Sequence, residues 1–272
     1  MLKFYTSSPK YFPQSSSRIY LTRSANKIPK DSVDFGFKKV DRSEKEKLVK
    51  QLFDKVSHKY DLMNDLMSLG LHRWWKRDFV RQLAINDGIR ICDMAGGTGD
   101  ISAQILSMNP DTDLRIDICD LSSEMIERGK ENLKSNKINW HCCNAEKLPF
   151  EDSSFDIYTI AFGIRNVTNM NKVLKECNRV LKPNGRFVCL EFSNVDNLLL
   201  NNLYRYYSFK IIPIIGYLVA GDWDAYQYLV ESIEKFPKKE LFTEIIRENN
   251  FENVEYNSLN GGIVCIHSGY KV

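Results

Sequence analysis

The amino-acid sequence predicts an α/β fold: a mostly parallel sheet with helices on both faces, a C-terminal β-hairpin and an N-terminal helical extension. Three observations carry this prediction. Strand patterns and helical patterns alternate strictly between residues 89 and 192, as in β-α-β units. A glycine-rich turn follows the first of these strands at once. Asn260-Gly261 separates two final strand-like runs, which is a strong hairpin signal.

The composition is that of a globular protein and excludes several classes. The chain has 272 residues, of which 43% are hydrophobic and 27% charged, so it is long enough for a sizeable core. No apolar run reaches the ~18 residues of a transmembrane helix. Seven cysteines without a C-x-x-C pair indicate reduced, mostly buried thiols. A net charge of +3 is too small to predict a nucleic-acid partner.

The positive charge is concentrated in residues 1–30, which hold six basic residues, six serines and no acid. This segment therefore carries +6, and residues 31–272 carry −3. A basic, serine-rich and acid-free N-terminus is typical of an organellar transit peptide, and the lack of a continuous apolar run argues against a secretory signal. We predict a mitochondrial transit peptide over 1–30, with a basic tail that has no targeting role as the alternative.

Residues 31–86 are predicted to form an N-terminal helical cap. Leu48, Leu52 and Val56 recur at helical spacing, so they lie on one side of a helix. The helical pattern continues to about residue 82, and Gly70 interrupts it. The cap therefore contains more than one helix.

The domain predicted over residues 87–272 begins with the alternating elements. Strands are expected at 89–94, 114–121, 139–143, 155–162 and 185–192, and helices at 98–108, 122–135 and 169–181. Ser122 can cap the second helix, because a serine oxygen accepts hydrogen bonds from the free N–H groups of the first turn. The run KPNG at 182–185 predicts a turn before the last of these strands.

After Ser193 the pattern becomes irregular and contains many aromatic residues. The remaining expected elements are two helices and the two strands of the hairpin, at 226–235, 238–249, 254–259 and 262–267.

The strongest chemical signal is the run 93–100 (DMAGGTGD), which joins a buried strand to a helix. Glycines let a ligand approach the backbone, and the free N–H groups of a helix N-terminus face that ligand. In an open parallel sheet the binding crevice lies at the carboxyl ends of the strands. Asp120 ends the next strand, 21 residues after Gly99, where an acid can accept hydrogen bonds from ribose hydroxyls.

Two cofactor classes fit this loop, a dinucleotide and the nucleoside S-adenosylmethionine. The dinucleotide fingerprint G-x-G-x-x-G lacks its third glycine here. A dinucleotide would also place a pyrophosphate near Asp100, whereas Asp93 and Asp100 favour a positively charged sulfonium. The loop therefore favours S-adenosylmethionine. The alternatives are a nicotinamide-dependent oxidoreductase and a glycine turn without a ligand.

Several motifs far apart in the chain resemble one family. The glycine loop with Asp120-Leu121-Ser122 resembles the class I S-adenosylmethionine-dependent methyltransferases, which have a Rossmann-like fold. Further segments resemble the UbiE/MenG quinone C-methyltransferases: 59–65 (KYDLMND), 70–74, 162–167 (FGIRNV), 179–186 (RVLKPNGR), 228–233 and 261–264. The likeness covers about residues 46–272. With the predicted transit peptide it points to the mitochondrial, ubiquinone-forming branch of that family, and only this peptide disfavours menaquinone chemistry.

This resemblance implies methylation of a ring carbon of 2-methoxy-6-polyprenyl-1,4-benzoquinol, with S-adenosylmethionine as cofactor and no metal. Bacterial members use a serine to bind the cofactor where this chain has Ala161, so one side-chain contact is missing here. Taking the glycine loop and the resemblance together, cofactor contacts are expected at Asp93, Gly97, Thr98, Asp120, Asn144 and Ala145.

The chemistry singles out Arg165 and Asn166 as catalytic candidates. An aromatic carbon becomes an adequate nucleophile when the neighbouring hydroxyl is ionised, and a quinol hydroxyl titrates near that of tyrosine, about 10. Arg165 stays charged and can stabilise the quinolate oxygen with several hydrogen bonds, while Asn166 orients it or binds the ring oxygen. A surface ion pair is the structural alternative for Arg165. Tyr60 and His72 in the cap are candidates for binding the substrate ring.

Other features are predicted to be structural. His141-Cys142-Cys143 lies in a strand pattern with the wrong spacing for zinc. Trp74 and Trp75 are assigned to the core, with a prenyl tunnel as the alternative.

The apolar run 211–221, interrupted by Pro213 and Gly216, is too short to span a bilayer. It is either a mobile lid that contacts lipid or the prenyl tail, or a segment packed on the sheet. The family resemblance also implies a complex with other ubiquinone-synthesis proteins and peripheral contact with the matrix side of the mitochondrial inner membrane. A homodimer stays open, and a non-catalytic scaffold with this fold is a further alternative.

Overall fold

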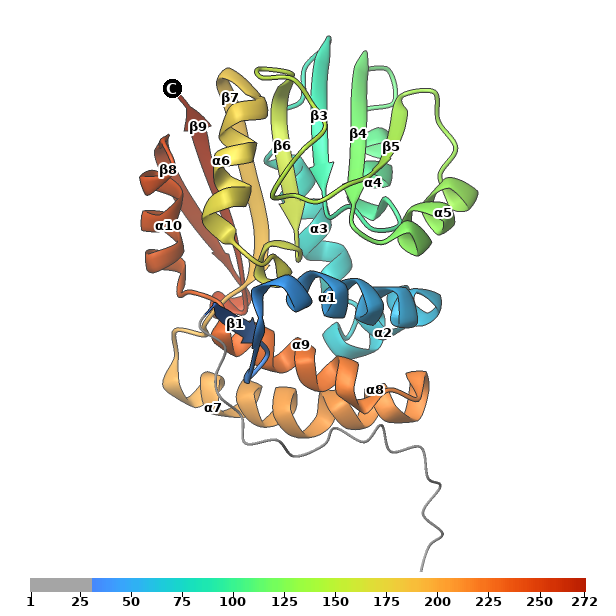
Figure 1. The fold of residues 1–272 in the computed structure, drawn as a ribbon, viewed down its shortest axis with the longest axis vertical. Coiled ribbons are helices and arrows are strands. Elements are labelled where there is room, and N and C mark those ends of the chain that lie inside the picture. Colours follow the sequence, from blue (N-terminus) through green and yellow to red (C-terminus); the bar gives the residue numbers. More distant parts are fainter. Residues whose placement is uncertain (1–30) are drawn as a thin grey trace, which may run out of the picture.

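The computed structural model describes residues 31–272, so the predicted transit peptide over 1–30 lies outside the described residues (Figure 1). A seven-stranded sheet forms the centre, in the order β5-β4-β3-β6-β7-β9-β8. Its strands are β3 (Ile89–Met94), β4 (Leu114–Asp120), β5 (Ile138–Cys142), β6 (Phe155–Ala161), β7 (Leu181–Phe192), β8 (Phe251–Leu259) and β9 (Val264–Lys271). Strands β3 to β7 pair in parallel, whereas β9 is antiparallel to β7 and β8. The predicted mostly parallel sheet with a C-terminal hairpin is confirmed.

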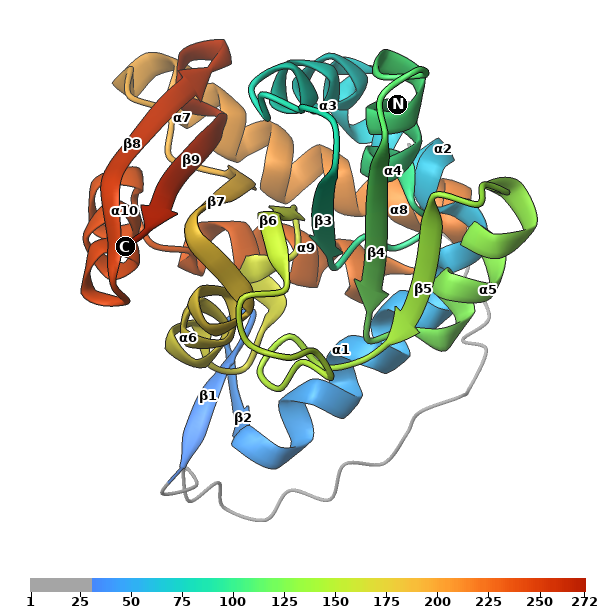
Figure 2. The ribbon, with the colours of Figure 1, turned by 90° about the horizontal axis from the view of Figure 1, so that it is seen from above.

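Helices cover both faces of this sheet, as predicted (Figure 2). They are α3 (Leu71–Arg81), α4 (Asp100–Met108), α5 (Ser123–Asn132), α6 (Met170–Val180) and α10 (Lys239–Glu248). Ile91 of β3 shares one buried cluster with Phe79 of α3 and Ile105 of α4. The next strand residue, Cys92, shares the other cluster with Leu174 of α6. Successive strand residues point to opposite faces, so each strand contributes to two buried cores.

Of two local signals in the sequence, the helix cap predicted at Ser122 is confirmed and the turn predicted at 182–185 is not. The Ser122 hydroxyl accepts a hydrogen bond from the Met125 N–H at 3.1 Å, so Ser122 caps α5 as expected. The turn predicted at 182–185 is instead a bulge inside β7. Leu181 pairs with Phe155 and Arg186 with Ile157, so four residues are looped out within the strand. Asn184 there has a positive φ of 63°, which asparagine tolerates better than most residues.

A layer of helices covers the carboxyl ends of the parallel strands (Figure 1). It combines α1 (Arg42–Val56) and α2 (Tyr60–Ser68) with α7 (Leu198–Tyr206), α8 (Ile212–Ala220) and α9 (Trp223–Lys235). Val56, Met63, Ile212 and Tyr226 meet in a third buried cluster. The layer therefore combines helices that precede the first sheet strand in the sequence with helices that follow β7.

The irregular segment predicted after Ser193 is in fact helical, which corrects the sequence interpretation. A π-helical turn, Tyr207–Ile211, joins α7 to α8. Pro213 is tolerated because it lies in the first turn of α8, where its missing N–H would have no partner. Gly216 lets α9 approach closely, since a Cβ there would lie 2.1 Å from the Tyr226 ring.

A short hairpin that the sequence did not predict lies within the predicted helical cap, before α1. It consists of β1 (Ser32–Phe35) and β2 (Lys38–Asp41), turning at Gly36 with a φ of 58°. The Phe35 ring stacks on Tyr228 of α9 with 4.2 Å between centroids. Within residues 31–272, no helix has both the length and the hydrophobicity that crossing a membrane requires.

Candidate active site

The glycine loop after β3 bends back over the carboxyl ends of β3 and β4. Gly97 and Gly99 have positive φ values of 56° and 86°, and α4 begins directly after Gly99. The Gly97 N–H donates to Asp120 Oδ2 at 2.9 Å, and Asp120 Oδ1 accepts from the Ser122 N–H at 2.8 Å. One carboxylate thus ties the two loops together, and burial raises its pKa above the usual value.

A pocket of about 800 Å³, including its open mouth, lies between these loops and helix α1. Four of the predicted cofactor contacts line it: Gly97, Asp120, Asn144 and Ala145. Space is open above Gly97, where a Cβ would meet no atom within 4 Å. Ala161 also lines the pocket and leaves it wider than a serine would. Open backbone at Gly97, the carboxylates of Glu46, Asp120 and Glu146, and apolar walls suit a nucleoside with a cationic sulfonium, so the residues fit S-adenosylmethionine.

The other two predicted cofactor residues do not line this pocket. Asp93 is only 1% exposed and accepts hydrogen bonds from Ser102 and Thr159, at 2.6 and 3.0 Å. Burial raises the pKa of Asp93 to about 6. Asp93 therefore supports the loop from behind. Thr98 is half-buried on the loop, and its side chain does not face the pocket.

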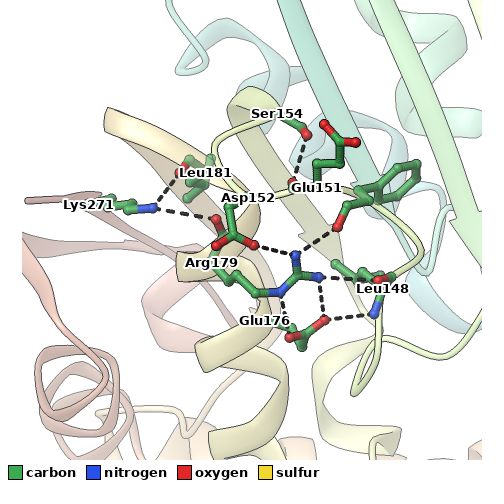
Figure 3. Close-up of polar contacts among 9 residues, drawn as sticks. Leu148, Glu151, Asp152, Ser154, Glu176, Arg179, Leu181 and Lys271 are labelled. Carbon is green, nitrogen blue, oxygen red and sulfur yellow. Dashed lines mark hydrogen bonds and ion pairs between the residues drawn. The ribbon is translucent and has the colours of Figure 1, made fainter.

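The loop after β5 is held by an arginine from the 179–186 motif (Figure 3). Arg179 of α6 donates to the carbonyls of Phe150 and Leu148 and to the carboxylates of Asp152 and Glu176, at 2.7 to 3.2 Å. Arg179 keeps the pKa of Glu176 below its usual value. This network fixes the segment that follows Asn144 and Ala145, so the motif acts on the pocket through its supporting loop.

A second, larger cavity of about 2050 Å³, including its open mouth, lies beneath the helical layer. Its walls are mainly apolar and come mostly from α1, α2, α3, α7, α8, α9 and the segment after β6. Phe53, Phe162 and Asn166 line both this cavity and the cofactor pocket. A molecule in the cavity and a cofactor in the pocket would therefore meet at these three side chains.

Like Lys76, Arg165 is a buried cation in the wall of this cavity. Its side chain is 6% exposed, and Nη1 donates to Glu191 Oε1 at 2.8 Å and to the Phe162 carbonyl at 2.6 Å. Among the residues that the structure describes, Nη2 makes no hydrogen bond, and the buried Nε has no partner either. The guanidinium also lies 5.4 Å from the ring centroid of Phe192. The ion pair is therefore buried, and part of the cation stays available to a ligand.

Asn166 and His72 also line the cavity. The Asn166 Oδ1 accepts a hydrogen bond from the Tyr228 hydroxyl at 3.0 Å, which orients the amide. His72 lies at the start of α3, and its Nε2 is 2.8 Å from Asp65 Oδ1. The side chain of Tyr60, the other predicted substrate contact, lies outside the described part of the structure.

Sequence reasoning missed three groups at the site. Glu191 holds Arg165, and Glu46 of α1 accepts from the Asn144 amide at 2.8 Å. Trp75, Phe162 and Phe192 form an aromatic wall of the cavity, with centroids 4.8 to 6.3 Å apart. Trp75 is 2% exposed, which confirms its core assignment, and it also lines the cavity. Trp74 is 45% exposed, so its core assignment is wrong. The FGIRN motif and the candidates His72 and Trp75 were the sequence signals for this region.

Comparisons with known proteins agree on the family. The model of the ubiE/COQ5 methyltransferase family matches residues 40–271. A ubiquinone/menaquinone biosynthesis C-methyltransferase UbiE from Rickettsia prowazekii is 50% identical over 248 residues, which is 89% of this chain and 99% of the relative. The mitochondrial 2-methoxy-6-polyprenyl-1,4-benzoquinol methylase of Drosophila melanogaster is 49% identical over 254 residues, covering 88% and 84%.

Solved structures support the fold. A SAM-dependent methyltransferase from Thermotoga maritima has a TM-score of 0.59 at 17% identity, with 82% of this chain and all of that chain covered. A Haloferax volcanii putative methyltransferase complexed with the activator Trm112 gives 0.60 at 15% identity, covering 82% and 96%. The predicted class I methyltransferase fold is confirmed. With the family model matching most of its length, the chain belongs to the ubiE/COQ5 methyltransferase family.

Proposed function

We propose that this protein methylates a ring carbon of 2-methoxy-6-polyprenyl-1,4-benzoquinol, using S-adenosylmethionine, in ubiquinone biosynthesis. The observation that carries the proposal is the contact of two unlike pockets at Phe53, Phe162 and Asn166. One pocket suits a nucleoside. The other is large and mainly apolar, and the Arg165 guanidinium in its wall has an Nε atom without a partner among the described residues. The name of the Drosophila relative supplies the substrate.

The cofactor supplies an activated methyl group, and the chain supplies its binding site. Gly97 and Ala145 shape the pocket, while Asp120 and Asn144 provide polar contacts. Asp93 and Thr98 contribute through the loop they belong to, with Asp93 anchored to Ser102 and Thr159 behind it.

Arg165 and Asn166 are the proposed catalytic residues. The free edge of the Arg165 guanidinium donates to the quinol oxygen, and its charge stabilises negative charge on that oxygen in an apolar cavity. Glu191 keeps the guanidinium in place. Asn166 lies between the two pockets and positions the ring near the cofactor, because Tyr228 fixes its amide. The cavity walls, with His72 and Tyr60 from the cap, receive the ring and the first prenyl units.

The polyprenyl tail requires contact with a membrane, and α7 and α8 offer a surface for it (Figure 1). Leu199, Leu203 and Leu218 are 81%, 66% and 75% exposed. Leu203 also lines the cavity, so the tail can leave the cavity directly into lipid. Exposed apolar patches of this kind mark interaction sites. We therefore favour the lipid-facing alternative for this segment, with the protein peripheral to the membrane.

The location follows from the same proposal. Residues 1–30 would direct the protein into mitochondria, as the name of the Drosophila relative suggests for that protein. The site of action would then be the matrix side of the inner membrane, beside other ubiquinone-synthesis proteins.

A methyl-transfer assay tests the proposed function. The full chain receives methyl-labelled S-adenosylmethionine and a short-chain 2-methoxy-6-prenyl-1,4-benzoquinol, and NMR locates the new methyl group. We expect a C-methyl product, and S-adenosylhomocysteine but not NAD should bind with high affinity. An O-methyl product, or no transfer to any quinol, would refute the proposal. A naphthoquinol as competing substrate separates ubiquinone from menaquinone chemistry.

Flotation with phospholipid vesicles tests the membrane contact. Replacing Leu199, Leu203 and Leu218 by serine together should reduce co-flotation and the turnover of long-chain quinols, but not of short-chain ones. Leu241→Ser is the matched control, because Leu241 is 56% exposed on α10, away from this surface. Equal flotation of both variants would contradict the assignment.

A further inference from the structure

His72 and Asp65 form an oriented pair at the wall of the apolar cavity. The His72 Nε2 lies 2.8 Å from Asp65 Oδ1, and an ionised carboxylate can only accept a hydrogen bond. Nε2 therefore carries the hydrogen, and in the neutral ring Nδ1 is left as an acceptor. Arg73 donates to both oxygens of Asp65 at 2.7 Å, which fixes the carboxylate. The Asp65 pKa accordingly lies well below its usual value.

The Nδ1 atom of His72 has no hydrogen-bond partner within residues 31–272. The side chain is 8% exposed, it lines the cavity, and Nδ1 is buried without a hydrogen bond to any residue that the structure describes. Leaving such an acceptor unpaired costs a native structure stability. A hydroxyl group of a ligand in the cavity would remove this cost, and such contacts tighten when the substrate binds.

The His72 ring is neutral at physiological pH. Burial is the main cause that lowers the His72 pKa below its usual value of about 6.5, and Lys76 on the same helix adds to it. Asp65 on α2 and Asp100 on α4 oppose this shift without reversing it. Lys76 is itself paired with Asp100. At pH 7 the ring is therefore a base with a free Nδ1.

Arginine, lysine and tyrosine side chains also line the cavity. Arg165 has no acceptor atom. Lys76 is ion-paired with Asp100. Burial raises the pKa of Tyr204 to about 12 and the pKa values of Tyr207 and Tyr228 above their usual value, so these three hydroxyls stay protonated at pH 7. His72 is therefore the favoured base.

Resting on the proposed function, we infer that His72 is the general base that removes the proton from the quinol hydroxyl next to the reacting carbon. Asp65 is its positioning residue. The hydroxyl O–H bond breaks, the proton binds Nδ1, and the electron pair left on oxygen makes the ortho carbon nucleophilic. This carbon would take the methyl group from the sulfonium of S-adenosylmethionine as the S–CH3 bond breaks, which leaves S-adenosylhomocysteine. Its own proton would then pass through water to the quinol oxygen, so that the ring regains aromaticity. One proton per turnover passes from His72 to water.

The test compares His72→Asn with the wild-type full chain over a range of pH and quinol acidity. General-base catalysis contributes about 10²–10⁴-fold, so kcat at pH 7 should fall at least ~100-fold while S-adenosylhomocysteine binding is kept. Wild-type kcat should rise with pH as His72 deprotonates below pH 6.5 and then level off, because the neutral ring is the active form. In His72→Asn, kcat should no longer rise with pH in this range. Its deficit should shrink towards zero with quinols whose hydroxyl is made more acidic by an electron-withdrawing substituent.

The chain contains a matched control. His141 Nε2 lies 2.7 Å from Asp117 Oδ1, and Arg90 pairs with the same carboxylate, but His141 lines neither pocket. His141→Asn should keep wild-type kcat and pH profile. Asp65→Asn should lose kcat and regain part of it with the acidic quinols, as expected for a positioning residue.

Two results would overturn the inference while wild-type methyl transfer stands. One is a His72→Asn kcat within threefold of wild type, and the other is a deficit that does not depend on quinol acidity. Absence of methyl transfer in the wild type would instead refute the proposed function. Cofactor binding by each variant shows that it has folded.

Discussion

The two pockets that meet at Phe162 and Asn166 are built in different ways. The cofactor pocket is formed mainly by short segments at the carboxyl ends of strands: the loop 93–100, Asp120 and the segments after β5 and β6, with α1 as a further wall. The cavity is assembled from α1, α2, α3 and α7 to α9, and α7 lies more than 100 residues after α3 in the sequence. Local loops thus build most of the first pocket, whereas the second depends on tertiary packing throughout. Substitutions should therefore affect binding and turnover separately.

The largest expected effect comes from Arg165→Ala. Removing one donor to a developing oxyanion costs about 10²–10³-fold in kcat, so turnover should fall by that amount. Affinity for S-adenosylhomocysteine should stay within twofold of wild type, because Arg165 does not line the cofactor pocket. Steady-state kinetics measures kcat, and calorimetric titration measures the affinity for S-adenosylhomocysteine. An equal loss of kcat and of cofactor affinity would show that the two pockets are not independent.

Asp120→Asn should have the opposite effect, lowering cofactor affinity much more than turnover. In asparagine only one oxygen remains to accept hydrogen bonds, so either the Gly97 N–H or the Ser122 N–H loses its acceptor. The pocket also loses a negative charge. A charged hydrogen bond contributes about 1.5–3 kcal/mol, so cofactor affinity should fall roughly 10- to 100-fold. Turnover at saturating cofactor should change far less. Asp111→Asn, an exposed acid, is the control. Unchanged affinity would contradict the assignment of this pocket.

Arg179→Ala probes the support of the cofactor pocket. The variant loses hydrogen bonds to two carbonyls and two carboxylates (Figure 3). We expect a loss of about 2 kcal/mol, or roughly 4–8 °C in Tm, with cofactor affinity reduced a few-fold. Thermal unfolding with and without S-adenosylhomocysteine measures both. A variant with wild-type Tm would show that the loop is held by other contacts.

Tyr228→Phe should have the smallest effect, and only on the cavity side. It removes one neutral hydrogen bond to Asn166, worth about 1 kcal/mol. We expect kcat to fall about fivefold while cofactor affinity and Tm stay close to wild type. A change in cofactor affinity larger than that in kcat would contradict the assigned role of Asn166.

Much of the fold could be predicted because its signals are local. The strand Ile89–Met94, the cap at Ser122 and the hairpin around Asn260 follow from patterns within a few residues. The loop at 182–185 became a bulge because β7 continues its pairing with β6 on both sides of it. Helix α8 was missed because it contains Pro213 and Gly216, which normally interrupt helices, and only packing against Tyr226 explains the glycine.

For the site as well, the residues that follow from local signals could be predicted and those that depend on tertiary packing could not. Gly97, Asp120, Asn144 and Ala145 line the pocket where they were expected, since each follows a predicted strand. Asp93 lies behind the loop because strand alternation turns its side chain towards Ser102 and Thr159. Glu191 and Phe192 carry no motif, and their role appears only when β7 brings them beside Arg165.

A crystal structure of the full chain with S-adenosylhomocysteine and a short-chain quinol tests the central claim most directly. The account predicts the nucleoside beside Gly97, Asp120 and Asn144. It predicts the quinol ring against the wall of Trp75, Phe162 and Phe192, with one oxygen on Arg165. A quinol bound outside the apolar cavity, or a nucleoside bound inside it, would contradict the account.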